Sequence, residues 1–244
     1  MRHVLLTAAI VIGSLFASAG VQAETVRLTS LEWPPYSGAD LPNQGASIAV
    51  AKAAFEAMGH ELTVDFYPWS RAVALAKRDD QYVGYFPEYH YESDEFVFSN
   101  VMGTGPMGFV EPSDQPVAWE TLSDLTDARL GVVQDYVNTA KLDQMIDDGQ
   151  INASAVASDR QNVLKVAAGR IDLAVIDSNV LTYLLENDER VSSVRDKVQM
   201  NDKLLVTKKL YVAFRNNADG RRWQDIFNKG LKKIDVKAIM SRNM

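Results

Sequence analysis

The stretch RLGVVQDYVNTAKLDQMIDDGQINASAVASDRQNVLKVAAGRIDLAVID, residues 129–177, alternates short β-type segments with segments of helical periodicity. The apolar spacing predicts three strands and two helices, over 129–133, 139–146, 153–157, 160–168 and 172–176. Gly149 and Gly169 follow the two helices, where glycine commonly ends a helix. This strand–helix–strand–helix–strand order predicts a mostly parallel sheet flanked by helices.

The N-terminal half of the chain shows the same order. Strands are predicted over 25–32, 62–67 and 82–86, with helices over 44–58 and 70–77. The chain is therefore expected to be an α/β protein with two such units. Each unit is expected to form one lobe.

Two segments are expected to connect the lobes. Residues 103–113 hold three glycines and two prolines, which suits a first crossover. The C-terminal part has extended segments and a helix but no strand–helix repeat, so it is expected to return to the first lobe. The predicted lobes are 24–109 plus 207–244, and 110–206.

Composition excludes several classes of function. The chain has 244 residues and a net charge of −7, which disfavours binding to nucleic-acid phosphates. It has no cysteine, so zinc ribbons, iron–sulfur clusters, thiol catalysis and disulfides are excluded. Three histidines make a histidine-rich metal site improbable, and neither a metal nor a cofactor is expected.

The first 23 residues resemble an export signal. Arg2 and His3 precede an almost wholly apolar run over 4–20, and residues 21–23, Val-Gln-Ala, suit cleavage by signal peptidase. A membrane anchor is the alternative, but the run is near the lower length limit for a span. We expect a signal peptide over 1–23, cleaved after Ala23, and an exported protein, most simply in a bacterial periplasm.

Candidate ligand-binding residues lie where the predicted strands end, because ligands of parallel α/β sheets bind beyond the carboxyl ends of strands. The residues that follow these strands include aromatic side chains, acids and one arginine, which is typical of a small-molecule pocket. Each residue also has a structural alternative, such as a helix cap for Asp177 or a solvent-exposed position for Arg71 or His90. The candidates are Glu32, Trp33, Tyr36, Trp69, Arg71, Glu88, His90, Tyr136, Asn138, Thr139 and Asp177.

Signals for catalysis are weak. The sequence has no Gly-x-Ser-x-Gly motif and no glycine-rich phosphate loop, and no catalytic residue is assigned. Glu32, Glu88 and Glu92 share one predicted rim, so paired carboxylates for glycosidase chemistry remain an open alternative.

The chain resembles the bacterial extracellular solute-binding proteins of family 3, the polar amino-acid receptors of ABC importers. The motifs that carry this resemblance are Trp33-Pro34-Pro35-Tyr36-Ser37, Phe98-Ser99, Leu130-Gly131-Val132-Val133-Gln134, and the run from Ala168 to Asp177. The resemblance covers nearly all of the chain after the signal. It implies a two-lobed periplasmic-binding-protein fold of type II, hinged by two crossovers.

The resemblance also assigns roles to residues. The family's closing aspartate, which contacts the α-ammonium group of the ligand, falls on Asp177. The second-lobe loop that contacts the ligand carboxylate falls on 135–139, although the family usually has glycine where Asp135 stands. The family's carboxylate-binding arginine is absent, because residues 88–95 hold four acids and no arginine. Either Arg71 replaces that arginine, or the ligand is a cation or another amine-bearing solute.

The resemblance implies a periplasmic binding protein that delivers a small polar or amine-bearing solute to the membrane permease of an ABC importer. A monomer without enzymatic activity is expected. Two alternatives stay open, namely an enzyme on the same fold, such as a cyclohexadienyl-dehydratase-like lyase, and a sensory module that presents its ligand to a membrane receptor.

We predict that the exported protein begins at Glu24, because small residues occupy the positions three before and one before this cut. Mass spectrometry of the intact protein from a periplasmic extract measures its N-terminus. Recovery from the membrane fraction with Met1 retained would contradict this prediction.

Overall fold

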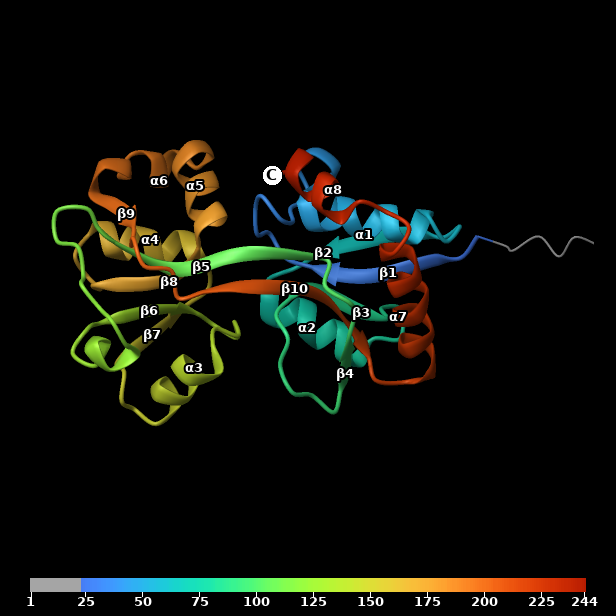
Figure 1. The fold of residues 1–244 in the computed structure, drawn as a ribbon, viewed down its shortest axis with the longest axis horizontal. Helices are drawn as coiled ribbons and strands as arrows, with labels where there is room; N and C mark the ends of the chain where they lie inside the picture. Colours follow the sequence, from blue (N-terminus) through green and yellow to red (C-terminus); the bar gives the residue numbers. More distant parts are fainter. Residues whose placement is uncertain (1–22) are drawn as a thin grey trace, which may run out of the picture.

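The computed structural model describes residues 23–244, which form two lobes joined by two long strands (Figure 1). The predicted signal peptide lies outside the described residues, apart from Ala23. Within the described part of the chain, no helix combines the length and the apolar character that crossing a membrane requires.

Lobe 1 is built on three parallel strands in the order β2–β1–β3. Helices α1 and α2 lie on opposite sides of this sheet, as Figure 1 shows. A short strand, β4, and a 3-10 helix, η1, complete the N-terminal part of the lobe. The bounds are β1 Thr25–Ser30, η1 Pro42–Gln44, α1 Ala46–Glu56, β2 Glu61–Phe66, α2 Trp69–Arg78, β3 Gly84–Glu88 and β4 Phe96–Phe98.

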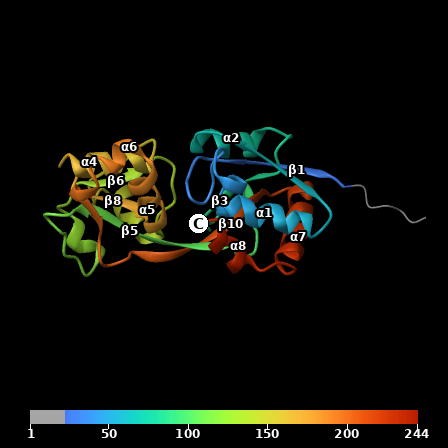
Figure 2. The same cartoon turned by 90° about the horizontal axis from the view of Figure 1, so that it is seen from above.

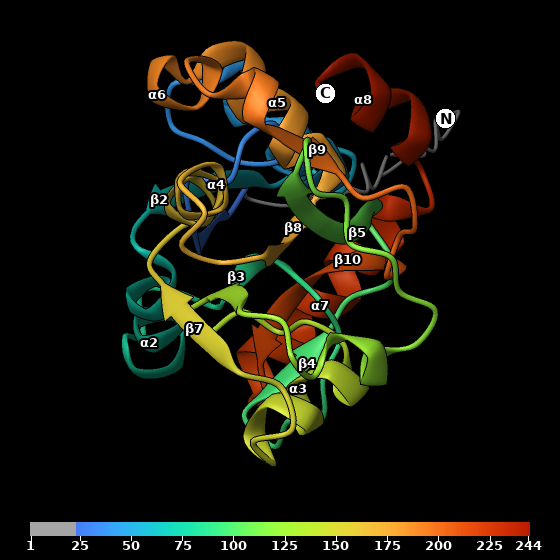
Figure 3. The ribbon, with the colours of Figure 1, turned by 90° about the vertical axis from the view of Figure 1, so that its left-hand side faces the viewer.

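Lobe 2 repeats this plan with parallel strands in the order β8–β6–β7. Helix α3 lies on one side of the sheet, and α4 and α5 lie on the other (Figure 3). The bounds are η2 Leu122–Leu125, β6 Leu130–Val133, α3 Ala140–Asp147, β7 Ala153–Val156, α4 Asp159–Ala167, β8 Leu173–Asp177, α5 Ser178–Asn187, α6 Glu189–Ser192, η3 Arg195–Lys197 and β9 Val198–Met200.

The lobes are connected by β5 (Gly103–Pro112) and β10 (Val206–Arg215). These strands pair antiparallel over five residues, from Gly103 with Leu210 to Met107 with Val206. Beyond that stretch, β5 pairs with β8 and β9, and β10 pairs with β3 and β4. Figure 2 shows the two strands passing together from lobe to lobe. The predicted first crossover is formed by strand β5, whose backbone groups bond to neighbouring strands on both sides.

The C-terminal helices return to lobe 1. Helices α7 (Ala218–Leu231) and α8 (Val236–Arg242) both pack against α1. The contact between α7 and α1 is close, because a Cβ atom on Gly230 would lie 2.0 Å from the backbone oxygen of Ala54. The lobe boundaries expected from the sequence stay a prediction, and both fall in or beside β5 and β10.

The predicted architecture is confirmed: the chain is an α/β protein of two lobes joined by two crossovers. The predicted strands and helices occur in the expected order, with ends that differ by a few residues. The buried apolar residues form a single core cluster that extends through both lobes. Its largest fully buried side chains include Leu28, Phe55, Phe86, Phe214 and Phe227 in lobe 1, and Leu125 and Leu130 in lobe 2.

We predict that Gly230→Ala lowers the free energy of unfolding by about 1–3 kcal/mol, because the added methyl group forces α7 away from α1. Chemical denaturation followed by circular dichroism measures the change. Lys229→Ala, at the exposed neighbouring position, is the control and should change stability by less than about 0.5 kcal/mol. Equal stability of Gly230→Ala and the wild type would contradict the close helix contact.

Candidate functional site

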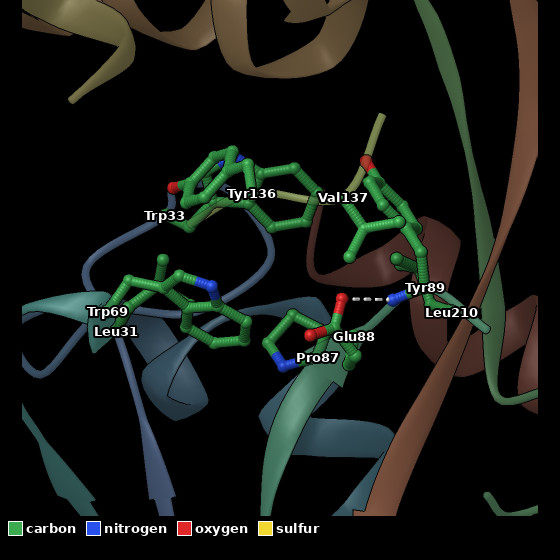
Figure 4. Close-up of a pocket in the computed structure, with 9 residues that line it drawn as sticks. All are labelled: Leu31, Trp33, Trp69, Pro87, Glu88, Tyr89, Tyr136, Val137 and Leu210. Atoms are coloured by element: carbon green, nitrogen blue, oxygen red, sulfur yellow. Dashed lines mark hydrogen bonds between the residues drawn. The ribbon is translucent and has the colours of Figure 1, made fainter. Parts of the chain in front are cut away.

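The carboxyl ends of the parallel strands from both lobes meet at the lobe interface. There they enclose a small pocket of about 20 Å³, which is room for about one water molecule. In Figure 4 the side chains of Trp33, Trp69 and Tyr136 surround the space into which the Glu88 carboxylate points. The lining residues are Leu31, Trp33, Trp69, Pro87, Glu88, Tyr89, Tyr136, Val137 and Leu210.

Aromatic rings form the walls of this pocket. The Trp33 ring stacks on Tyr36 at a centroid distance of 4.5 Å and meets Tyr89 edge-on at 6.3 Å. The Trp69 ring meets Tyr136 edge-on at 6.0 Å, so a ring from lobe 1 touches a ring from lobe 2. The negative faces of such rings attract cations.

Three buried carboxylates face the interface, those of Glu88, Asp159 and Asp177, with exposed fractions of 6%, 7% and 3%. Burial raises the pKa of Glu88 to about 8, although the Tyr89 backbone N–H donates to Oε1 at 2.6 Å. Burial, followed by the charge of Asp177, raises the pKa of Asp159 to about 7. Burial also raises the pKa of Asp177 to about 6. The interface therefore disfavours three negative charges unless a cation accompanies them.

Asp177 links the two lobes. It is the N-cap of α5, where its carboxylate accepts hydrogen bonds from the backbone N–H groups of Asn179 at 2.8 Å and Val180 at 3.3 Å. The Tyr36 hydroxyl of lobe 1 reaches the same carboxylate at 3.1 Å and accepts a hydrogen bond from the Asn179 side chain at 2.8 Å. A Cβ atom on Gly105 would lie 2.1 Å from Asp177 Oδ2, so only glycine lets strand β5 pass this close.

A second link between the lobes involves Asp135. Its backbone oxygen accepts a hydrogen bond from Trp69 Nε1 at 3.1 Å, and its carboxylate accepts one from the Ser70 hydroxyl. Asp135 has a φ of 61°, a left-handed conformation that favours glycine and is tolerated by aspartate. The backbone thus keeps a conformation suited to glycine at this position, and the aspartate side chain adds a bond to lobe 1.

Lys208 supplies a positive charge beside the pocket. Its ammonium group lies 4.5 Å from the centroid of the Tyr89 ring and donates to the backbone oxygen of Asn138. Burial lowers the pKa of Lys208, while Asp143 and Glu88 oppose this shift. Among residues 23–244, no lysine or arginine lines the small pocket itself.

The structure brings most of the predicted residues to the interface. Trp33, Trp69, Glu88 and Tyr136 line the pocket described above, and Tyr36 contacts Asp177. Asn138 and Asp177 line an adjoining space, together with Trp33 and Tyr136. Asn138 is held by Asp143, which accepts its backbone and side-chain N–H groups at 3.0 and 2.7 Å.

Three predicted residues, Arg71, His90 and Thr139, lie away from these spaces, and a fourth, Glu32, lies at a groove beside them. Arg71 is exposed and its guanidinium stacks over the Tyr67 ring at 5.0 Å. His90 is exposed and packs against Phe98, as expected for a surface histidine. The Thr139 hydroxyl caps α3, and Glu32 is exposed, with Oε1 bound to the Ala39 N–H. Glu32 still borders an open groove at the interface.

The sequence reasoning did not select Tyr89, Asp159 or Lys208. Asp159 follows strand β7 closely, so inspecting that strand's carboxyl end would have found it. Tyr89 directly follows strand β3, next to the predicted residue Glu88. Lys208 has no local signal, because its place depends on the antiparallel pairing of β10 with β5, where it lies opposite Gly105. The described residues contain no group of three or more histidine, aspartate or glutamate side chains placed to hold a metal ion.

No protein-family model matches the chain, and no curated protein matches it at a significant level. Solved structures do match in fold. One is a histidine kinase sensor domain with similarity to periplasmic binding proteins, with a TM-score of 0.75 and 18% identity, covering 89% of this chain and 95% of that chain.

Two further matches are ligand-bound proteins. An ancestral arginine-binding protein bound to arginine has a TM-score of 0.71 and 17% identity, covering 90% of this chain and 96% of that chain. The GluR0 ligand-binding core from Nostoc punctiforme, in complex with L-glutamate, has a TM-score of 0.69 and 14% identity, covering 89% and 96%. At these identities the matches confirm the resemblance in fold. The structures named are binding proteins and a sensor domain.

We predict that the free energy of unfolding falls as pH rises from about 4.5 to about 8. In this window folded Glu88 keeps the proton that the unfolded chain has lost, so the folded state binds more protons. Glu88→Gln removes this group and should flatten the pH dependence, by about 1–3 kcal/mol across the window. Denaturation with urea at several pH values measures it.

The matched control is Glu92→Gln, which makes the same charge change at an exposed position a few residues away. It should retain the slope of the wild type. Parallel pH profiles for Glu88→Gln and Glu92→Gln would contradict the buried, protonated state of Glu88.

Proposed function

We propose that this chain is a binding protein that captures a small amine-bearing solute between its two lobes. The observation that carries the proposal is the excess of buried carboxylates, Glu88, Asp159 and Asp177, over cations at the interface. Burying a carboxylate without a partner costs free energy. A raised pKa reduces this cost, because the carboxyl group then keeps its proton. The ammonium group of a solute supplies the missing positive charge in place of those protons.

The aromatic walls support the same class of ligand. Lys208 already lies over the face of Tyr89, which is the arrangement that an ammonium group adopts with an aromatic ring. Trp33, Trp69 and Tyr136 offer further ring surface within the pocket. Their apolar faces also suit a hydrocarbon part of the solute, because burying apolar surface away from water is favourable.

A solute with a carboxylate is less well accommodated. In the part of the chain described, Lys208 is the cation beside the pocket, and its ammonium group is bound to the Asn138 backbone. Arg71, the alternative carboxylate anchor, is exposed and stacks on Tyr67. We therefore propose that the ammonium group, and not a carboxylate, is the part of the solute that the site recognises.

Closure of the lobes is the proposed response to binding. The pocket of about 20 Å³ is too small for a solute of several heavy atoms, so the lobes must open to admit one. Tyr36 with Asp177, and Trp69 and Ser70 with Asp135, bond across the interface when the lobes are closed. A ligand that touches both lobes adds to these contacts and shifts the population toward the closed form.

We further propose that the protein is exported and works in a periplasm, where the closed form is recognised by a membrane protein. The resemblance to ABC-importer receptors favours a permease as that partner. The similarity to a histidine kinase sensor domain favours a sensor receptor as the second candidate. Co-purification of the ligand-loaded protein with membranes that contain one or the other partner separates the two.

We predict that pentylamine binds more tightly than norleucine, and that hexanoate does not bind. These compounds share a hydrocarbon chain and differ in carrying the ammonium group, both charged groups, or the carboxylate. Isothermal titration calorimetry measures the three affinities. Tighter binding of hexanoate than of pentylamine would contradict the proposal, and turnover of a bound compound would indicate an enzyme.

Asp177→Asn should weaken pentylamine binding by about 2–5 kcal/mol, because it removes the charge that pairs with the ammonium group. The stability of the protein should change little, since asparagine caps a helix about as well as aspartate. Arg71→Lys is the control and should leave the affinity unchanged. A loss in Arg71→Lys without a loss in Asp177→Asn would indicate recognition of a carboxylate instead.

A further inference from the structure

An open groove continues from the small pocket toward the surface. Its volume is about 490 Å³, and it shares Trp33, Trp69 and Tyr136 with the pocket. Both lobes contribute to it, lobe 1 through the ends of β1 and β2 and lobe 2 through the starts of α4 and α5. A solute that extends beyond the pocket would therefore lie in this groove.

Asp159 borders two spaces at the lobe interface. It lines the groove and also the adjoining space that Asp177 lines. As the first residue of α4 it lies where a helix favours a negative charge, but an exposed carboxylate would serve that purpose equally well. Its exposed fraction of 7% is thus not explained by the helix.

The Asp159 carboxylate is poorly satisfied. Within residues 23–244, no side chain donates to it a hydrogen bond of normal geometry. The indole N–H of Trp33 is near enough to lower its pKa, yet Trp33 Nε1 is itself buried without a hydrogen-bond partner in the described structure. The Asp159 carboxylate therefore keeps acceptor capacity at the wall of the groove, and a hydrogen-bond donor such as an ammonium group can use it.

Charges along the groove favour a cation. Glu32 stands on its rim, and Arg160 is the arginine among its lining residues. The Arg160 guanidinium is already paired with Asp188 at 3.3 Å, so it does not neutralise Asp159. The remaining walls are largely apolar, through Phe66, Tyr67, Pro68, Val180 and Leu184. This combination suits a hydrocarbon chain that ends in an ammonium group.

We propose that Asp159 forms a second cation subsite, and that the solute is a linear diamine. One ammonium group binds between Glu88 of the small pocket and Asp177 of the adjoining space, and the other binds at Asp159 where the groove begins. The hydrocarbon chain between them lies against the rings of Trp33 and Tyr136. This inference rests on the proposed function, because it requires that the pocket recognises an ammonium group.

The test compares pentane-1,5-diamine with pentylamine, which differ in the second ammonium group. Isothermal titration calorimetry should show that the diamine binds about tenfold more tightly or better to the wild type. Asp159→Asn should bring the two affinities within about threefold of each other, because it removes the partner of the second ammonium group. Circular dichroism and thermal unfolding show independently that the variant is folded.

Asp147→Asn is the matched control, since Asp147 is an exposed aspartate of lobe 2 outside the groove. It should keep the diamine preference of the wild type. Equal affinities for the two amines in the wild type, or a diamine preference that survives Asp159→Asn, would overturn the second subsite and leave the proposed function standing. Binding of neither amine would overturn the proposed function itself.

Discussion

The antiparallel pairing of β5 with β10 is the constraint on which the rest of the site depends. Beside this pairing, β5 pairs with β8, which sets Met107 opposite Asp177 in lobe 2, and β10 pairs with β3, which sets Tyr211 opposite Glu88 in lobe 1. Between these two points the pairing sets Lys208 opposite Gly105, whose missing side chain leaves room for Asp177 and Tyr36. The strands that join the lobes therefore also place the carboxylates and the lysine of the site.

Because the same strands belong to both lobes, the proposed closure of the lobes would act on the charges that these strands position. Asp159 and Asp177 of lobe 2 are buried in this structure, and closure against lobe 1 would be the step that takes them out of water. Without a ligand, burial raises the pKa of each of these carboxyl groups and that of Glu88. A bound cation removes that penalty, so closure and cation binding favour each other through the same desolvation.

Local patterns in the sequence were enough to predict the strands and helices of the two repeated units and the strand ends that meet at the lobe interface, but not the short strands β4 and β9 or helix α8. Trp33, Trp69, Glu88 and Asp177 were predicted because each lies at or just beyond the carboxyl end of a strand, and parallel strands bring these ends to one edge. Lys208 could not be found in this way, since its place depends on two strands about one hundred residues apart in the chain. Arg71 and His90 also come after strands, but packing sets which way their side chains face. Arg71 lies in the first turn of α2, His90 lies in a loop, and both are exposed.

The contact of Tyr36 with Asp177 limits how a ligand can use that carboxylate. An ionised carboxylate has about four acceptor positions, and Asp177 already accepts from two backbone N–H groups and from the Tyr36 hydroxyl. One position is left, so an ammonium group can join without displacing Tyr36. The bond between the lobes and the bond to the ligand then coexist on one side chain. Asp177 in this way makes closure and capture of an ammonium group parts of the same hydrogen-bond arrangement.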